Sequence, residues 1–122
     1  MYKILIADDE ELEREALRFF INESSLDIDQ VIECASGTEV IKRVMLDRPD
    51  IIVLDINMPV MDGYDALRLI RERAPDIPVI ALTAYAFETD RQRMFQAGFN
   101  ECLAKPLRAD ELRSRIASLL SR

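Results

Sequence analysis

Residues 51–63 read Ile-Ile-Val-Leu-Asp-Ile-Asn-Met-Pro-Val-Met-Asp-Gly, and this stretch decides the fold. Its first four residues form an uninterrupted apolar run, which is typical of a strand buried on both faces of a sheet. The strand ends on Asp55, and turn-forming residues follow at once. A carboxylate at the end of a buried strand lies where open α/β sheets bind their ligands. Because an aspartate there is also common as a helix cap or turn residue, the rest of the chain has to decide between these readings.

Length, charge and composition exclude several classes of protein. The chain has 122 residues, a net charge of −7 and no histidine. This length suits one domain with its own core. The negative charge argues against binding nucleic acid or an anionic membrane, although simple solubility also explains it. Without histidine the chain has no serine–histidine triad and no histidine-based acid–base pair.

No targeting or membrane segment is predicted. No apolar run approaches the roughly 20 residues that a spanning helix needs. The apolar part of the N-terminus, residues 1–7, is too short for a signal peptide and is followed directly by acids. We therefore expect a cytoplasmic protein.

Short apolar runs alternate with segments of helical periodicity along the whole chain. The predicted strands are residues 2–7, 30–35, 51–55, 78–83 and 101–104. The first two predicted helices begin at Glu10 and at a capping box over 36–39, and the other three span 64–73, 89–97 and 109–120. Five strand–helix units predict one α/β domain over residues 1–122, a (βα)5 doubly wound parallel sheet of the flavodoxin-like kind with strand order 2-1-3-4-5. In this order Cys34 and Cys102 lie on opposite edge strands, too far apart for a disulfide.

Helical spacing also predicts which side chains pack on the sheet. In the first helix the recurring apolar residues are Leu12, Ala16, Phe19 and Phe20. A structural alternative for Asp8 or Asp9 is that one of them is only the N-cap of this helix. Other predicted core positions on the later helices are Val40, Ile41, Val44, Leu67, Ile70, Leu112, Ile116 and Leu119 or Leu120. Gly98 is the predicted C-cap of the fourth helix.

Polar side chains end four of the five predicted strands. They are Asp8 with Asp9, Asp55, Thr83 and Lys105. In the predicted order these four strands are neighbours, and the carboxyl ends of parallel strands meet at one edge of the sheet. Each residue alone has a structural explanation, but one shared site explains all of them.

The residue types at this edge suit phosphoryl transfer. Two carboxylates 4 Å apart repel by about 4 kcal/mol at an effective dielectric constant of about 20, and a hard cation such as Mg²⁺ relieves that repulsion. Lys105 supplies a positive charge for a phosphate oxygen, and Thr83 supplies a hydroxyl donor. Asp55, in the middle, is placed to act as a carboxylate nucleophile.

Over its whole length the chain resembles the receiver domain of two-component response regulators. The resemblance rests on Asp8-Asp9, Asp55-Ile56-Asn57-Met58-Pro59 with Asp62-Gly63, Thr83-Ala84, and Lys105-Pro106, each at a predicted strand end. Each dipeptide is a weak signal, but together they are highly specific. The resemblance implies two-component phosphorelay signalling, in which a phosphoprotein switch rather than an enzyme accepts a phosphoryl group and changes its binding.

The resemblance also implies a role for each of these residues. Asp55 accepts the phosphoryl group from a partner's phosphohistidine, and Thr83 and Lys105 act on it. The further phosphoryl contacts implied are Asn57 and the amide of Ala84. The implied Mg²⁺ ligands are Asp9 and Asp55 directly, Asp8 largely through water, and the backbone carbonyl of Asn57. The peptide bond between Lys105 and Pro106 is expected to be cis.

Two positions are expected to modify the switch. Receiver domains usually carry an aromatic ring three residues before the lysine, where this chain has Cys102. We expect weaker or differently routed coupling to the surface of helix 89–97, strand 101–104 and helix 109–120; the alternative is a small core residue. Tyr85 is expected to crowd the water that hydrolyses the aspartyl phosphate, and the alternative is a merely exposed loop residue.

The implied partners are a sensor histidine kinase or a histidine phosphotransfer domain. Such a partner is expected to dock on the first helix, where Leu12 either faces it or packs on the sheet. An effector domain or a homodimer is expected on the surface of 89–97, 101–104 and 109–120, where Phe87, Met94 and Phe95 mix core with partner surface. Whether the receiver stands alone or belongs to a longer regulator or hybrid kinase stays open.

Three rival functions remain. A phosphohydrolase of the haloacid-dehalogenase type uses a second acid two residues after its nucleophile, where this chain has Asn57. A nucleotide or flavin binder is disfavoured because no glycine-rich phosphate loop occurs. A pseudo-receiver that binds partners constitutively without phosphorylation is the main alternative, and the intact set of acids, threonine and lysine argues against it.

Overall fold

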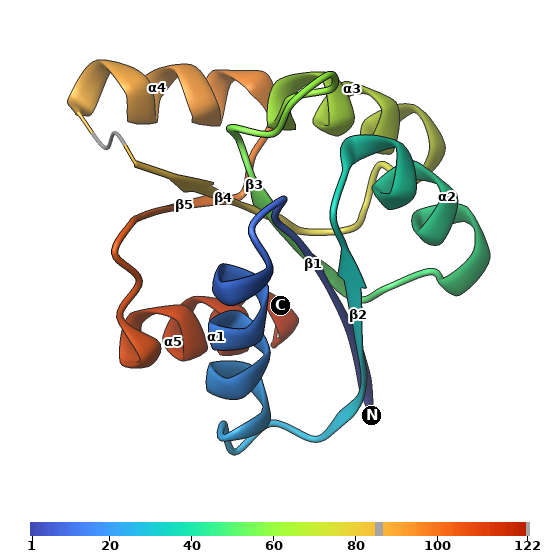
Figure 1. Cartoon of the computed structure of the whole chain (residues 1–122), viewed down its shortest axis with the longest axis vertical. Helices are drawn as coiled ribbons and strands as arrows, with labels where there is room; N and C mark the ends of the chain where they lie inside the picture. The colour runs from blue at the N-terminus through green and yellow to red at the C-terminus, as the bar shows by residue number, and fades with distance from the viewer. Residues whose placement is uncertain (85–86, 122) are drawn as a thin grey trace.

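A computed structural model describes residues 1–84 and 87–121, and strand and helix alternate through these residues (Figure 1). The strands are β1 (Tyr2–Ala7), β2 (Ile28–Cys34), β3 (Ile51–Asp55), β4 (Val79–Thr83) and β5 (Glu101–Ala104). The helices are α1 (Glu11–Asn22), α2 (Gly37–Asp47), α3 (Gly63–Arg73), α4 (Glu88–Ala97) and α5 (Ala109–Leu120). The predicted alternation is therefore confirmed, with small differences at the ends of some elements.

The five strands form one parallel sheet in the order β2-β1-β3-β4-β5. This is the predicted flavodoxin-like order, in which the chain starts in the middle, adds β2 at one edge and then crosses back to build towards β5. The apolar runs of β3 and β4 are buried along their full length, as expected for central strands covered by helices on both faces.

The two faces of the sheet carry separate cores, because alternate strand residues point to opposite sides. On β1, Leu5 and Ala7 pack towards α2, α3 and α4, whereas Ile4 and Ile6 pack towards α1 and α5. Figure 1 shows α1 and α5 together on one side of the sheet and the other three helices on the opposite side. The predicted core positions of α2, α3 and α5 are buried or partly buried.

The predicted inward face of α1 is wrong at Ala16 and Phe19, and Leu12, for which two alternatives were open, does not pack on the sheet. Leu12 is 79% exposed and Phe19 is 60% exposed, and the residues that pack on the sheet are Leu17 and Ile21, with Phe20 partly buried. Counting back from Ile21 at the i, i+4, i+7, i+8 spacing of an amphipathic helix puts Glu13 at the first position of this stripe. The sequence pattern missed the stripe because its first residue is charged.

The ends of the helices follow the predicted capping signals. The side chain of Ser36 caps α2 by accepting a hydrogen bond of 3.2 Å from the N–H of Glu39, whose carboxylate accepts one of 3.0 Å from the N–H of Ala35. Gly98 ends α4 with φ = 114°, a backbone conformation that glycine adopts without steric cost.

The two cysteines lie on the two edge strands, as predicted. Cys34 ends β2 and Cys102 is in β5, and both are free and buried. Burial raises the pKa of the Cys34 thiol to about 12, so this thiol stays protonated at neutral pH. Among the described residues, no helix combines the length and the apolar character needed to cross a membrane.

Candidate functional site

The polar residues at the strand ends come together at one edge of the sheet. Ala7 pairs with Leu54, and Asp55 pairs with Leu82, so the ends of β1, β3 and β4 are level. The only buried polar or charged side chains among the described residues are Asp8, Asp55 and Thr83, and all three lie at this edge. Burying a polar group costs free energy unless the group is paired, so three buried polar side chains at one edge of the sheet indicate a functional site and not a contribution to stability.

The loop after β3 fixes Asp55 in place. The N–H of Asn57 donates a hydrogen bond of 3.1 Å to Oδ1 of Asp55, and the N–H of Gly63 donates one of 2.8 Å to the carbonyl of Ile56. A Cβ atom on Gly63 would lie 2.7 Å from the Cα of Ile56, so only glycine allows this close return of the chain. Asp62 then caps α3 by accepting a hydrogen bond of 3.0 Å from the N–H of Asp65.

Three carboxylates at this edge form a candidate cation site. Asp8, Asp9 and Asp55 each offer an oxygen atom, and these atoms lie within 4.8 Å of one another. Asp9 is exposed, whereas Asp8 is fully buried and Asp55 is 2% exposed. Oxygen donors of this kind, two of them sheltered and one open to solvent, fit a hard divalent cation that keeps several of its waters.

Burial makes the ionised forms of Asp8 and Asp55 unfavourable. Burial raises the pKa of Asp55, although the N–H of Asn57 and the charge of Lys105 oppose the shift. Burial, and then a hydrogen bond with Glu13, raise the pKa of Asp8 to about 7. The protein thus keeps carboxylates where their negative charge is costly until a cation compensates it, which is typical of functional sites.

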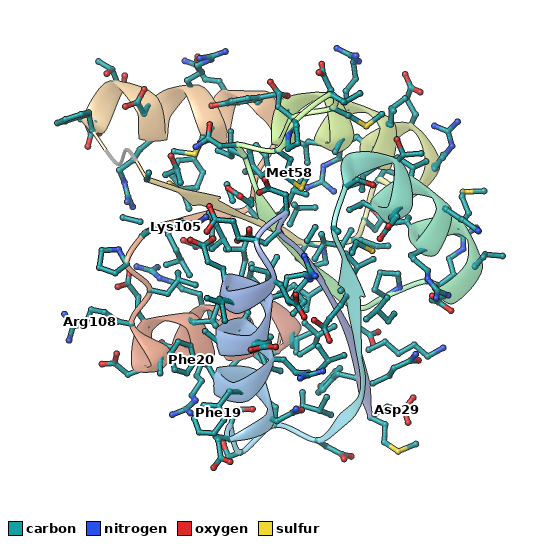
Figure 2. The ribbon with its side chains drawn as sticks, in the orientation of Figure 1. Phe19, Phe20, Asp29, Met58, Lys105 and Arg108 are labelled. Carbon is teal, nitrogen blue, oxygen red and sulfur yellow. The ribbon has the colours of Figure 1, made fainter. Side chains whose placement is uncertain are left out.

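Lys105 provides part of that compensation. Its ammonium nitrogen lies 2.5 Å from Oε2 of Glu13, 3.3 Å from Oδ2 of Asp8 and 3.4 Å from Oδ2 of Asp55. Burial alone would lower the pKa of Lys105, but the hydrogen bond to Glu13 and the nearby negative charges raise it, so the lysine stays charged. Figure 2 shows Lys105 beside the first turn of α1, with Phe19 and Phe20 further along that helix.

The other predicted residues are exposed, buried in the core, or outside the described residues. Ala84 follows Thr83 at the exposed end of β4, and the Asn57 side chain is also exposed. The Lys105–Pro106 peptide bond is cis, as predicted. Cys102 is buried in the core on the side of α2, α3 and α4. Tyr85 lies outside the described residues.

Two residues of α1 that the sequence pattern did not indicate contact the site. Glu13 binds Lys105, and Arg14 donates a hydrogen bond of 2.7 Å to the backbone carbonyl of Asp8. The alternative that Asp8 or Asp9 is the N-cap of this helix is wrong: Glu10 occupies that position without a side-chain capping hydrogen bond, and its N–H donates to Oδ1 of Asp8 at 2.9 Å. The available signal for Glu13 was its place at the start of the buried stripe of α1, where an unpaired charge would be unfavourable.

A cavity of about 240 Å³ borders the site between α1 and the connection from β5 to α5. It is lined by Asp8, Glu13, Ala16, Phe20, Lys105, Pro106 and Leu107. Its walls are mostly apolar and reach Lys105, so a partner seated there would lie directly beside the acidic cluster.

The class of protein that this fold and site define is supported by comparison with known proteins. The family model for the response regulator receiver domain matches residues 4–117. Response regulator MprA of Mycobacterium leprae is 35% identical over 120 residues, which are 98% of this chain and 51% of MprA. Sensor protein EvgS of Escherichia coli K12 is 35% identical over 116 residues, which are 95% of this chain and 9% of EvgS.

A solved structure agrees with both relatives. The receiver domain of sensor histidine kinase PA1611 from Pseudomonas aeruginosa, solved with a magnesium ion coordinated in its active-site cleft, superposes with a TM-score of 0.87. It is 32% identical, and the match covers 99% of this chain and 98% of that domain. The chain belongs to the response regulator receiver domain family of two-component signalling. It spans about half of the length of MprA and a much smaller part of EvgS.

Proposed function

We propose that this receiver domain, comprising residues 1–122, accepts a phosphoryl group on Asp55 from the phosphohistidine of a sensor histidine kinase or a histidine phosphotransfer domain. The single observation that supports this most strongly is the environment of Asp55. Its carboxylate is 2% exposed, belongs to a three-carboxylate cluster and lies 3.4 Å from the ammonium of Lys105. A nucleophile, a cation site and a phosphate-binding charge are thus combined within one small volume.

In the proposed step, an Oδ atom of Asp55 attacks the phosphorus atom of the phosphohistidine. The new O–P bond forms as the P–N bond breaks, and the bonding electrons return to the imidazole nitrogen, which leaves. Lys105, the hydroxyl of Thr83 and the amide of Ala84 hold the oxygens of the transferring group, and Asn57 contributes a further contact. Positioning and charge stabilisation of this kind supply most of the catalysis in phosphoryl transfer.

The metal ligands we propose are Asp8, largely through water, with Asp9, Asp55 and the backbone carbonyl of Asn57. Bound Mg²⁺ would neutralise charge on the phosphoryl oxygens and on the acidic cluster. The three carboxylate oxygens within 4.8 Å of one another support this assignment.

The output we propose is a conformational switch rather than turnover of a substrate. Phosphorylation alters binding at α4, β5 and α5, to an effector domain or a second copy of the chain, and slow hydrolysis of the aspartyl phosphate resets the switch. Phe87, which precedes α4, and Phe95, which lies in α4, are exposed, whereas Met94 of α4 is buried. Of these three side chains, the two phenylalanines are therefore available to a partner. The kinase or phosphotransfer partner docks at α1 beside the cavity, in the cytoplasm.

The test is intact mass after incubation with acetyl phosphate and Mg²⁺. The parent should gain one phosphoryl group, and Asp55→Asn and a chelator should each prevent the gain. Asp29→Asn, which changes an exposed aspartate on β2, is the matched control and should react like the parent. If the parent gains no mass and beryllofluoride also fails to bind, the proposal is wrong and a constitutive pseudo-receiver takes its place.

A further inference from the structure

The three carboxylates around Lys105 do not hold it equally. Its ammonium nitrogen lies 2.5 Å from Glu13 but 3.3 Å from Asp8 and 3.4 Å from Asp55. Charge-assisted hydrogen bonds between nitrogen and oxygen are typically about 2.7–2.9 Å long, and longer contacts are weaker. The dominant partner of Lys105 is therefore Glu13, a residue outside the proposed acceptor and metal ligands.

The backbone around Glu13 is held against the site. The next residue, Arg14, donates a hydrogen bond of 2.7 Å to the carbonyl of Asp8, and its guanidinium lies 3.6 Å from Glu33 on β2. Arg18, one turn later, binds the same Glu33 at 2.8 Å. These contacts fix the first turns of α1 on the sheet, so the Glu13 carboxylate has a defined position beside Lys105.

We propose that Glu13 is a positioning residue that competes for Lys105 with a phosphoryl group on Asp55, and that Lys105 must leave Glu13 before it can bind that group. This inference rests on the proposed function. The 2.5 Å contact of Lys105 with Glu13 is the shortest of its three carboxylate contacts, so it is the contact that a phosphoryl group has to displace. By retaining Lys105, Glu13 slows phosphoryl acceptance. The donor and the cation together must draw the lysine away from Glu13 before the phosphoryl group is accepted.

The rate test compares Glu13→Gln with the parent. In the reaction with acetyl phosphate, an Oδ atom of Asp55 forms a bond to phosphorus as the P–O bond to acetate breaks, and acetate leaves as the anion. Partly exposed ion pairs have modest strength, so Glu13→Gln should accelerate acceptance roughly two- to fivefold. Glu11→Gln removes the same charge from an exposed position of the same turn and should leave the rate unchanged.

A structural test separates retention of Lys105 from general charge repulsion and uses the unaltered chain. In a structure with Mg²⁺ and beryllofluoride, Lys105 should have left ion-pair distance of Glu13 and should contact a fluorine atom. Glu13→Asp, which keeps the charge on a shorter side chain, should accept phosphate at an intermediate rate. Melting temperatures of all variants would identify any that fail to fold.

Each outcome decides the inference. Three results would overturn the inference: a rate for Glu13→Gln equal to or below that of the parent, an equal rate gain in Glu11→Gln, or a Lys105 that is still bound to Glu13 in the presence of beryllofluoride. In each of these cases, acceptance of phosphate by the parent would leave the proposed function intact. If neither the parent nor Glu13→Gln accepts phosphate or binds beryllofluoride, the proposed function itself fails, and this inference fails with it. Acceptance by Glu13→Gln alone would support both.

Discussion

Lys105 Nζ lies 3.4 Å from Oδ2 of Asp55, although the two residues are far apart in the sequence and follow or end strands that are separated by β4. The same ammonium group lies 3.3 Å from the fully buried Asp8. One lysine thus pairs with two buried carboxylates at once. Removing one partner of a buried pair is much more destabilising than the net contribution of the pair suggests, because it leaves a buried charge uncompensated.

Replacing Lys105 by methionine should therefore destabilise the metal-free protein. We expect Lys105→Met to lower the free energy of unfolding by about 2–4 kcal/mol in a chelating buffer at neutral pH. Added Mg²⁺ should recover part of the loss, because it compensates the same carboxylates. Urea denaturation with and without Mg²⁺ measures both effects.

The matched control is Lys42→Met, which removes an exposed lysine of α2. Its effect should stay within about 0.5 kcal/mol. Equal losses in the two variants, or a loss in Lys105→Met that Mg²⁺ does not change, would contradict the role given to Lys105.

Asp8 should make the metal-free protein less stable as pH rises. Burial raises its pKa in the folded chain to about 7 from an ordinary value of 3.8, so between about pH 4 and pH 7 the folded state keeps a proton that the unfolded state has lost. The free energy of unfolding therefore falls as pH rises through this window. Asp8→Asn should remove this slope and stabilise the protein above pH 7 by about 2 kcal/mol.

Denaturation in a chelating buffer across this pH range measures the slope. Asp9→Asn, at the exposed neighbouring position, should keep it. A slope that is the same in Asp8→Asn as in the parent would show that Asp8 does not carry the buried proton.

Gly63 should tolerate no side chain. A Cβ atom there meets the Cα of Ile56 at 2.7 Å and the carbonyl oxygen of Asp55 at 3.2 Å, and backbone atoms beside the acceptor cannot move without moving Asp55. We expect Gly63→Ala to lower the free energy of unfolding by roughly 2 kcal/mol or more and to slow phosphoryl acceptance. Chemical denaturation and the mass assay measure these two effects.

Gly37→Ala is the comparison for this prediction. Its Cβ would meet the side chain of Met61 at 2.9 Å, and this flexible side chain can move away. Gly37→Ala should change stability by less than about 1 kcal/mol. Equal losses at the two glycines would mean that the close return of the chain at Ile56 is not needed.

Cys102→Tyr tests the expected departure in coupling. Cys102 is buried in the core, so a ring at this position has to displace its neighbours, and we expect a loss of about 1–3 kcal/mol. If residue 102 limits coupling to α4, β5 and α5, the variant should also change dimerisation when beryllofluoride is added, measured by sedimentation. Cys102→Val, closer in volume, controls for packing; an unchanged response to beryllofluoride in Cys102→Tyr would refute the coupling idea.

The sequence predicts most of the fold and the proposed site because both follow from short-range patterns. The runs 51–54 and 79–82 are apolar throughout, and a parallel sheet brings the residues that follow its strands to one edge. Asp55, Thr83 and Lys105 were found in this way without any knowledge of contacts. Caps such as Ser36 and Gly98 are equally local signals.

The face of α1 was mispredicted because its cause is not local. Periodicity favours Leu12 and Phe19, which are apolar but exposed, and it discounts Glu13, which is charged but turned inward. Glu13 is stabilised there by Lys105, from the other end of the chain, and no local pattern records this pairing. The pairing depends on how α1 packs beside the connection from β5 to α5, which the strand order alone does not determine.

The most direct test of the central claim is to locate the phosphoryl group among the clustered carboxylates. The protein phosphorylated by acetyl phosphate is reduced with borohydride, which converts an aspartyl phosphate to homoserine, and its peptides are sequenced by mass spectrometry. We expect homoserine at position 55 and at no other position. Homoserine at position 8 or 9 with Asp55 unmodified would contradict it, because the buried acceptor at the end of β3 would then not be the nucleophile.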